Sequence, residues 1–219
     1  MQAHLLSTVF AVPWFRSSFR LGGGTALAEY YLGHRISDDI DLFTIDPADL
    51  RPAAKLVREM ADSEKSVRVA VLRSHPLQWT FSVSTPRGDE TRVDITTVDT
   101  PFRDAAIELE GVTVASLYDI VIGKMLAASD RTEGKDVIDL WAIEKLANMH
   151  LNELADELGA RDPRFVVSPD RWARTLHRLA VSLPDLDLPR AIVEVSGAEL
   201  KRFFEQASLD ALKRLLPDA

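Results

Sequence analysis

The sequence predicts an α+β fold in which a strand-rich first part, residues 1–113, is followed by a helical second part, residues 114–219. Before Thr113, three runs alternate apolar and polar residues with a period of two, as half-buried strands do. After Thr113, apolar residues recur three and four positions apart, which is typical of helices that bury one face. We therefore expect a sheet-containing domain and a helical region.

The first part contains two expected helices and four expected strands. Thr25–Leu32 has helical composition and follows a short strand-like segment that ends in Gly22–Gly24. In Trp79–Ser84 the odd-numbered residues are apolar, and Thr85–Asp89 supplies a turn after this strand. The expected elements are helix Thr25–Leu32, strand Asp39–Ile45, helix Pro47–Asp62, and strands Val67–Arg73, Trp79–Ser84 and Thr91–Thr96.

The second part contains only expected helices. Ser116 and Asp119 resemble a capping box, the pattern that starts a helix. Further helical periodicity extends over Asp136–Ala147, Asn152–Leu158, Pro169–Val181 and Ala198–Leu216. This half therefore adds helices but no expected strand.

The composition limits the classes of function. The 219 residues have a formal net charge of −8 and a pI near 5.2, which disfavours a protein whose whole surface binds nucleic acid but allows a local basic cleft. The absence of cysteine excludes disulfides and thiolate metal sites. No apolar run is long enough to span a bilayer, and Met1–Phe15 lacks the pattern of a signal peptide. We therefore expect a cytoplasmic protein.

Three aspartates form the strongest candidate site. Asp39 and Asp41 lie two positions apart on an expected strand, so both point to one face while Ile40 and Leu42 enter the core. Adjacent carboxylates repel unless a cation lies between them, and hard divalent ions prefer oxygen ligands. Asp94, on the polar face of a later strand, is the expected third ligand. A solvated strand edge is the alternative, and the metal site is the interpretation that we prefer.

The glycine run is the second half of the candidate site. Glycines between a strand and a helix allow backbone amides to approach phosphate oxygens, and the helix N-terminus adds positive potential. Gly23 and Gly24 are expected to supply such amides, and Thr25 a hydroxyl donor. A plain turn is the alternative. The order of glycine run, Asp-Ile-Asp and later Asp94 favours phosphates and metals held in one cleft.

These residues resemble a known family, the nucleotidyl transferase AbiEii/AbiGii toxins of type IV toxin–antitoxin and abortive-infection systems, within the polymerase-beta-like nucleotidyltransferase superfamily. The resemblance covers roughly Phe19 to Leu140. It rests on Gly-Gly-Thr-Ala-Leu at Gly23–Leu27, on Arg35, Ser37, Asp39, Asp41, Leu42 and Phe43, on Lys124–Ala128 with Arg131, and on Lys135, Asp136, Asp139 and Leu140.

The resemblance implies a fold and an activity. The fold would be a polymerase-beta-like mixed sheet flanked by helices, with a helical C-terminal region that completes the active-site cleft. The activity would be metal-dependent transfer of a nucleoside monophosphate from an NTP to an acceptor hydroxyl, with Mg²⁺ or Mn²⁺ as cofactor and release of pyrophosphate. The expected acceptor is the 3′ end of tRNA, and the expected partner is a cognate antitoxin. The alternatives are a protein or small-molecule acceptor, or a catalytically silent nucleotide-binding regulator.

The resemblance also assigns roles to residues. It places metal-binding acids at Asp39, Asp41 and, with less support, Asp94, and the helical lysine and later acid of the family at Lys124 and Asp136. We expect the nucleotide to contact Gly23, Gly24, Thr25, Arg35, Ser37, Lys124 and Arg131, and the catalytic residues to be Asp39, Asp41, Asp94, Lys124 and Asp136. The extra acid, Asp38, departs from the family pattern.

The residues themselves leave several alternatives open. Lys124 lies on an apolar helix stripe, so it either extends to solvent or meets a buried anion. Asp136 is either a solvated acid near a helix start or the partner of Lys124 or Arg131. His34 is expected to serve loop structure. The arginines at 171, 174 and 178 recur at helical spacing, and we favour a solvated charged face over an RNA-binding stripe.

Overall fold

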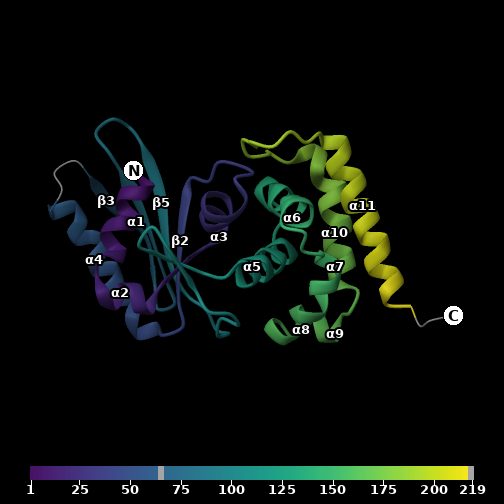
Figure 1. Ribbon diagram of the computed structural model, residues 1–219, viewed down its shortest axis with the longest axis horizontal. Coiled ribbons are helices and arrows are strands. Elements are labelled where there is room, and N and C mark those ends of the chain that lie inside the picture. The colour runs from purple at the N-terminus through teal and green to yellow at the C-terminus, as the bar shows by residue number, and fades with distance from the viewer. Residues whose placement is uncertain (64–66, 217–219) are drawn as a thin grey trace. The chain divides into compact units, whose positions relative to one another are not determined.

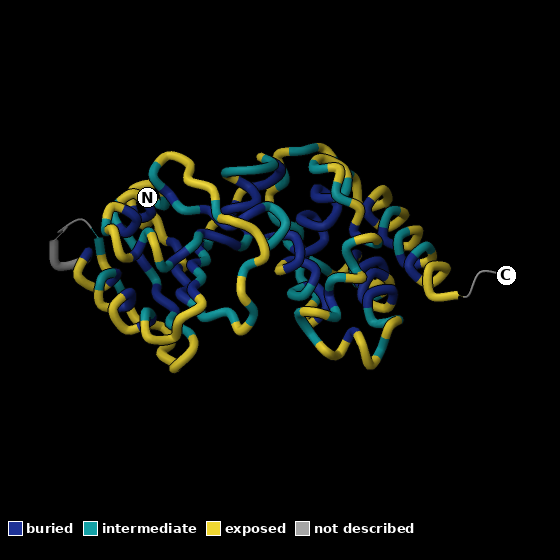
Figure 2. The backbone as a smooth tube through the Cα atoms, turned by 60° about the horizontal axis from the view of Figure 1, so that its bottom comes forward, coloured by how far each residue is buried: buried dark blue, intermediate teal, exposed yellow. Residues whose placement is uncertain are grey.

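The chain folds into two compact units (Figure 1). The computed structural model describes residues 1–63 and 67–216, with the backbone alone for 61–63. The first unit comprises Met1–Tyr30 and Ser37–Asp119, and the second comprises Tyr31–Ile36 and Ile120–Ala219. Each unit has a buried interior of its own, shown in dark blue in Figure 2. A short segment of the first half of the sequence, residues 31–36, thus belongs to the helical unit.

A seven-stranded mixed sheet forms the first unit, with strand order β3-β4-β5-β2-β1-β7-β6. The pairs β2–β5 and β1–β7 are parallel, and the other neighbours are antiparallel. The predicted α+β class, with a mixed sheet and a helical second part, is confirmed. The strands are β1 (Arg20–Gly22), β2 (Asp39–Thr44), β3 (Arg68–His75), β4 (Gln78–Ser84), β5 (Glu90–Thr97), β6 (Ile107–Leu109) and β7 (Val112–Val114).

Alternation along the central strands separates an apolar face from a polar face. On β2, Ile40 and Leu42 are fully buried, whereas Asp39 and Asp41 are partly exposed. This pattern is the predicted one, because successive side chains of a strand point to opposite faces. The polar face of β2 therefore carries both aspartates.

The helices of the first unit cover the sheet. Helix α4 (Leu50–Ser63) follows the 3₁₀ turn Pro47–Asp49 and packs against β3, β4 and β5, and α1 (Gln2–Phe10) and α2 (Pro13–Ser18) pack against β7 (Figure 1). Phe15 stacks on Phe19 at a centroid distance of 4.4 Å. The sequence analysis did not predict α1 and α2, which are short and contribute few turns to the periodic signal.

Strand β3 differs from its prediction. Its alternating valines predict a half-buried strand, but most of its residues are exposed, including Val71 at 44% and Leu72 at 60%. The reason is its position, because β3 is an edge strand that pairs only with β4, and its register shifts between Val71 and Arg73. Irregular register is a common feature of sheet edges.

The hairpin of β6 and β7 was not predicted, although its sequence contains the signal. Glu110 and Gly111 join the two strands with φ angles of 51° and 78°. Two successive residues with positive φ are typical of the tight hairpin turns that match strand twist. The strands were missed because each has only three residues.

The regular elements of the second unit are all helices or helical turns in the described residues, apart from a single bridge between Arg35 and Ala191. Helices α10 and α11 pack closely along each other, and Ser196 caps α11 by accepting a hydrogen bond from the amide of Glu199. The predicted helix at Asn152–Leu158 is instead three short turns. The helices are α5 (Leu117–Asp130, whose first turn lies in the first unit), α6 (Gly134–Leu146), α7 (Leu151–Leu154), a 3₁₀ turn (Ala155–Glu157), α8 (Leu158–Arg161), α9 (Arg164–Val167), α10 (Arg171–Ser182), a 3₁₀ turn (Leu183–Asp185) and α11 (Gly197–Arg214).

Ser116 begins α5 as predicted. Its hydroxyl accepts a hydrogen bond from the amide of Asp119 at 3.0 Å and donates one to the Asp119 carboxylate at 2.8 Å. This carboxylate also accepts hydrogen bonds from the amides of Arg103 and Asp104, at 2.9 and 3.2 Å. Asp119 therefore fastens the segment before β6 to the start of α5.

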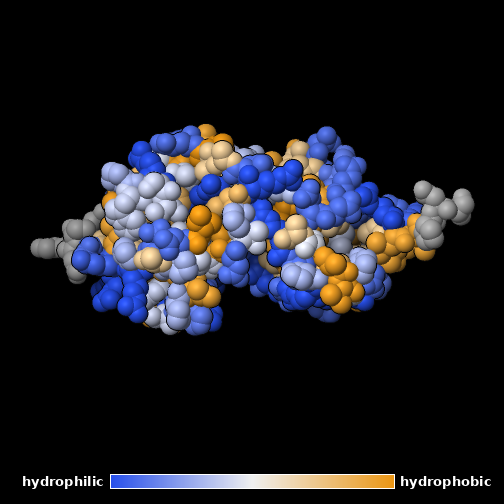
Figure 3. Space-filling model, turned by 90° about the horizontal axis from the view of Figure 1, so that it is seen from below, coloured by the Kyte–Doolittle hydropathy of each residue, from blue (hydrophilic) through white to orange (hydrophobic). Residues whose placement is uncertain are grey.

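Apolar groups on the surface are scattered. Figure 3 shows hydrophilic side chains over most of the face it draws, with apolar groups in separate patches. Among the described residues, no helix combines the length and the apolar character needed to cross a membrane.

The burial of the apolar face of β2 can be tested by comparing a buried isoleucine with an exposed one. Ile40→Ala is expected to lower the free energy of unfolding by about 2–5 kcal/mol, because it removes a fully buried side chain and leaves a cavity. Ile45→Ala changes a side chain that is 57% exposed and is expected to change stability by no more than about 0.5 kcal/mol. Urea unfolding measures both, and equal losses would contradict the assigned burial.

Candidate functional site

Four charged residues form a compact group on the polar face of β2 and β5. The two strands are parallel and in register, so Asp41 lies opposite Asp94 and Asp39 lies opposite Arg92. All four side chains alternate with buried apolar residues, including Ile40 and Val93. The register therefore brings together the three predicted metal-binding acids and adds a cation that the sequence analysis had not assigned.

The contacts of Asp94 fix its carboxylate. Oδ1 accepts hydrogen bonds from the Thr80 hydroxyl at 2.5 Å and the Gln78 amide at 3.3 Å, both from β4. Oδ2 accepts a hydrogen bond from Arg92 Nε at 2.9 Å, and Arg92 Nη2 lies 3.3 Å from Asp39 Oδ2. Burial alone would lower the pKa of Arg92, but Asp94 and Asp39 raise the pKa above its ordinary value. Arg92 is thus the cation between these two acids.

The glycine run lies directly beside the Asp-Ile-Asp segment. Gly22 pairs with Asp41 in the antiparallel ladder of β1 and β2, and Gly23 starts the helical segment formed by α3 (Gly23–Thr25) and the π-helical turn Ala26–Leu32. Gly23 has a φ of 63°, and a Cβ atom there would overlap the carboxylate of Asp41. Only glycine therefore allows the Asp41 carboxylate to lie against this helix start.

Thr25 has a contact that differs from the expected one. Its side chain is buried, and its hydroxyl donates a short hydrogen bond to the backbone carbonyl of Asp39. The hydroxyl thus joins the helix start to the first residue of β2. Gly24 and Thr25 remain at the N-terminal end of the helical segment, where backbone amides point outward along the axis.

The acidic face fits a divalent cation in its chemistry. Carboxylate oxygens are the ligands that Mg²⁺ and Mn²⁺ prefer, and a guanidinium already balances two of the three acids at this position. Within the part of the chain that the structure describes, no three histidine, aspartate or glutamate side chains converge as a ready-formed ligand set. The acids share a face, and Arg92 holds Asp39 and Asp94.

A second group of predicted residues lies in the helical unit around Asp139 of α6. The carboxylate of Asp139 is fully buried and contacts Lys124 Nζ at 2.6 Å. Arg35 donates to it from Nε at 2.6 Å and from Nη2 at 3.0 Å, and His34 Nε2 lies 2.7 Å from Oδ1. Of the two alternatives for Lys124, the buried anion is correct, and the anion is Asp139 rather than Asp136.

The charges of this cluster do not cancel. Burial alone would raise the pKa of Asp139, but Lys124, the hydrogen bond from His34 and Arg35 hold that pKa well below its ordinary range. One carboxylate thus contacts two basic side chains, Lys124 and Arg35. Because an ionised carboxylate only accepts, His34 Nε2 carries the proton, and the buried Nδ1 has no hydrogen-bond partner among the described residues. His34 connects residues 31–36 with α6, so it does more than shape a loop.

Asp136 and Ser37 are placed apart from these clusters. Asp136 is fully buried and accepts from Arg131 Nε at 3.0 Å and Nη2 at 3.1 Å, so its partner is Arg131 and it is not a solvated acid. Ser37 is buried, and its backbone carbonyl accepts a hydrogen bond from Gln2. The acid beside Lys124, Asp139, was missed because Asp136 and Asp139 share one face of the expected helix, and helical spacing alone does not distinguish them.

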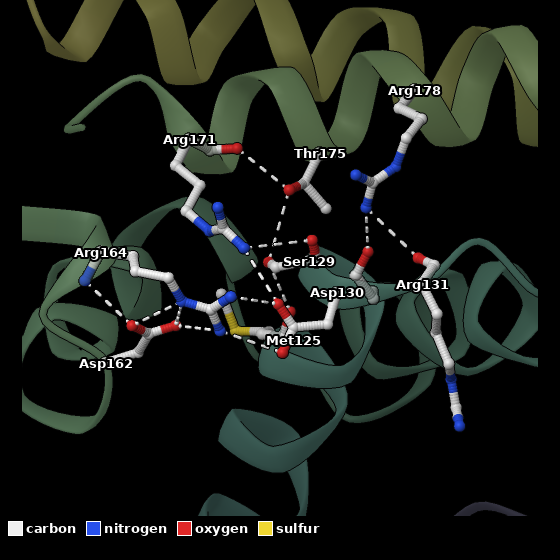
Figure 4. Close-up of polar contacts among 10 residues, drawn as sticks. Met125, Ser129, Asp130, Arg131, Asp162, Arg164, Arg171, Thr175 and Arg178 are labelled. Atoms are coloured by element: carbon white, nitrogen blue, oxygen red, sulfur yellow. Dashed lines mark hydrogen bonds and ion pairs between the residues drawn. The ribbon is translucent and has the colours of Figure 1, made fainter.

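Two arginines of α10 bind the carboxyl end of α5 (Figure 4). Arg178 donates to the carbonyls of Ala128 and Arg131 at 2.6 and 3.2 Å, and Arg171 donates to Asp130 at 3.0 Å. Cations are favourable at this end of a helix, where carbonyls lack helical partners. Arg171 and Arg178 therefore hold α10 to α5, and the expected solvated face is wrong for them.

A family model matches almost the whole chain. The model describes the nucleotidyl transferase AbiEii toxin of type IV toxin–antitoxin systems, and it matches residues 4–214. No curated protein gives a significant match. The match extends beyond the motif-bearing segment, to include all of α10 and α11.

Solved structures that share the fold include a nucleotidyltransferase toxin. JHP933 from Helicobacter pylori has a TM-score of 0.61 and 19% identity, and the alignment covers 97% of this chain and 91% of that one. MenT4, a nucleotidyltransferase toxin from Mycobacterium tuberculosis, has a TM-score of 0.52 and 16% identity, with coverage of 97% and 84%. The predicted nucleotidyltransferase fold is thereby confirmed.

The cost of placing a side chain against Asp41 at Gly23 can be measured separately from the cost of a positive φ angle. Gly33→Ala places a methyl group at a φ of 60° with no described atom within 4 Å, so it is expected to cost about 1–2 kcal/mol. Gly23→Ala has a similar φ and an additional overlap with Asp41, so it is expected to cost more. Urea unfolding of the two variants tests this, and equal costs would show that Asp41 does not lie against Gly23.

The buried position of Asp139 predicts a large loss of stability when its charge is removed. Asp139→Asn is expected to lower the free energy of unfolding by about 3–5 kcal/mol, because it leaves Lys124 and Arg35 buried beside a neutral group. The control Asp156→Asn removes an exposed partner of Arg214 and is expected to cost about 0–1 kcal/mol. Urea unfolding at neutral pH measures both.

The same carboxylate predicts a pH dependence. The pKa of Asp139 is lower in the folded chain than in the unfolded chain, so its ion pairs stabilise the fold above the unfolded value of roughly 3.9 and are lost as the pH falls through the folded value. The stability difference between wild type and Asp139→Asn should therefore narrow on acidification. A difference that stays constant from neutral pH to pH 3 would contradict this origin.

Proposed function

Because the chain belongs to the nucleotidyl transferase AbiEii toxin family of type IV toxin–antitoxin systems, we propose that it transfers a nucleoside monophosphate from an NTP to an acceptor hydroxyl of RNA, with release of pyrophosphate. The observation that carries the proposal is the placement of Asp41 opposite Asp94 and against Gly23. This arrangement sets carboxylates beside backbone amides at a helix start. Groups of these two kinds bind, respectively, the metal and the phosphates of a nucleotide.

The first unit would bind the metal–triphosphate. Asp39, Asp41 and Asp94 would hold Mg²⁺ or Mn²⁺, which when bound neutralises charge on the transferring phosphoryl group. The amides of Gly23, Gly24 and Thr25 would donate to phosphate oxygens. Since the Thr25 hydroxyl already donates to the Asp39 carbonyl, the side chain of Thr25 has a positioning role, and we assign only its amide to the nucleotide.

The second unit would supply positive charge. Lys124 neutralises triphosphate charge, and the excess of cations over Asp139 supports this role because a buried cluster with net positive charge favours an anionic ligand. Asp139 holds the lysine in place, and Arg35 binds the same carboxylate. Arg131, oriented by Asp136, would add a second cation. In the first unit, we also assign Ser37 to the nucleotide.

The acceptor and the partner follow from the family. We propose the 3′ end of tRNA as the acceptor, a cognate antitoxin as the regulator and the cytoplasm as the place of action. A protein side chain or a small molecule is the rival acceptor. A silent nucleotide-binding regulator is disfavoured because all three acids share one face and a glycine is retained where Asp41 approaches the backbone.

The test compares two neighbouring acids. Asp41→Asn is expected to lower nucleotide transfer by about 100-fold or more, because metal stabilisation of the transition state contributes several kcal/mol. Asp38→Asn alters an exposed acid three residues earlier and is expected to keep transfer close to that of wild type. Each purified protein is incubated with α-³²P-labelled NTPs, Mg²⁺ and, separately, total RNA, proteome extract or metabolites.

The distribution of label decides between the acceptors. Label at the 3′ end of tRNA, lost in Asp41→Asn and retained in Asp38→Asn, supports the proposal. Label only in protein or small molecules would overturn the RNA acceptor while keeping the transferase. Absence of label in every pool, with the NTP still bound, would favour the silent regulator.

A further inference from the structure

Arg92 occupies the acidic face where the proposed function requires a metal. Its Nη2 lies 3.3 Å from Asp39 Oδ2, and its Nε lies 2.9 Å from Asp94 Oδ2. The strand register supports both contacts, because Asp39 and Arg92 are direct neighbours across β2 and β5 and Asp94 follows two residues later on the same face. Three carboxylates share the face that this guanidinium contacts, and carboxylate oxygens are ligands that divalent cations prefer.

A guanidinium and a divalent ion compete for these oxygens. Both would bind the carboxylates of Asp39 and Asp94, and two positive charges a few ångströms apart repel each other. We propose that Arg92 is a built-in competitor of the divalent cation: it binds Asp39 and Asp94 in the metal-free protein and must leave them when metal binds. This inference rests on the proposed function, because it concerns the same acidic face.

The structure allows Arg92 to leave without disturbing Asp94. The side chain of Arg92 is 46% exposed, so the guanidinium can move into solvent. Asp94 keeps its orientation because Thr80 and Gln78 hold its other oxygen from β4. The acids are therefore positioned by the sheet, and Arg92 balances their charge until a metal replaces it.

The competition also links metal binding to nucleotide binding. Binding of a metal ion alone would release Arg92 from Asp39 and Asp94 without supplying a new anion. A metal ion that arrives with a triphosphate brings negative charge, to which a released guanidinium can bind. Metal should therefore bind wild type more tightly in the presence of a non-hydrolysable NTP analogue, and this gain should be smaller in a variant that lacks the guanidinium.

The direct test is Mn²⁺ binding, measured from the electron paramagnetic resonance signal of the free ion. Arg92→Gln is expected to lower the Kd for Mn²⁺ roughly tenfold or more, because it removes a competing charge. Arg92→Lys keeps a positive charge, so its Kd for Mn²⁺ should be closer to that of wild type. Arg68→Gln removes an exposed arginine from edge strand β3 and should leave the Kd unchanged, which controls for net charge. Circular dichroism confirms that each variant is folded.

A second measurement follows the guanidinium itself. In ¹⁵N NMR spectra of wild type, the Arg92 Nε–H signal, assigned by its absence in Arg92→Gln, should shift when diamagnetic Mg²⁺ is added. A shift on saturation with Mg²⁺ is expected if the hydrogen bond to Asp94 breaks. An unchanged signal under saturating metal would show that Arg92 stays in place and would overturn the proposal.

The outcomes separate this inference from the proposed function. If wild type binds Mn²⁺ in a manner that Asp41→Asn abolishes, and Arg92→Gln binds it more tightly, the metal site and the competition by Arg92 are both supported. If binding depends on Asp41 but Arg92→Gln leaves the Kd unchanged or weakens it, Arg92 is a positioning residue and only the competition is overturned. If no variant binds Mn²⁺ in an Asp41-dependent manner, the metal site itself is wrong and both are overturned.

Discussion

Charge balance around carboxylates is the constraint on which both units depend. In the first unit, parallel strands place Asp39, Asp41 and Asp94 on one face, where their mutual repulsion requires a cation, and Arg92 supplies it. In the second unit, Asp139 is buried completely, and Lys124, His34 and Arg35 lower its pKa against the opposing effect of burial. In each case the fold positions the acid and the cation stabilises the charged form.

The two clusters differ in exposure, and this difference suits different roles. Asp139 has no exposed surface, so its ion pairs are fixed parts of the fold that hold residues 31–36 against α6. Arg92 is partly exposed, so its ion pairs can exchange with solvent or with another cation. The exposed cluster lies beside the glycine-lined helix start, and the buried cluster keeps Lys124 in a defined orientation.

Much of the first cluster could be predicted from the sequence. The two-residue spacing of Asp39 and Asp41 fixes their shared face, and Asp94 between Val93 and Ile95 identifies a polar position on an apolar strand. Which strands are neighbours, and in which register, depends on the packing of the whole sheet, so the pairing of Arg92 with Asp39 was not predictable. The cluster around Asp139 was even harder to predict from the sequence. His34 and Arg35 lie more than one hundred residues from Asp139 and share no local pattern with it. Edge strand β3 shows the same limit. Its alternating sequence correctly predicted a strand, but its burial could not be predicted, because burial depends on which strands and helices lie beside it.

The most direct measurement of the central claim is anomalous diffraction from crystals of the protein soaked with Mn²⁺ and a non-hydrolysable NTP analogue. The account predicts an anomalous peak in contact with the carboxylates of Asp41 and Asp94, with the triphosphate against the amides of Gly23 and Gly24. A peak bound elsewhere on the chain, with Arg92 still between Asp39 and Asp94 and the nucleotide in place, would contradict it.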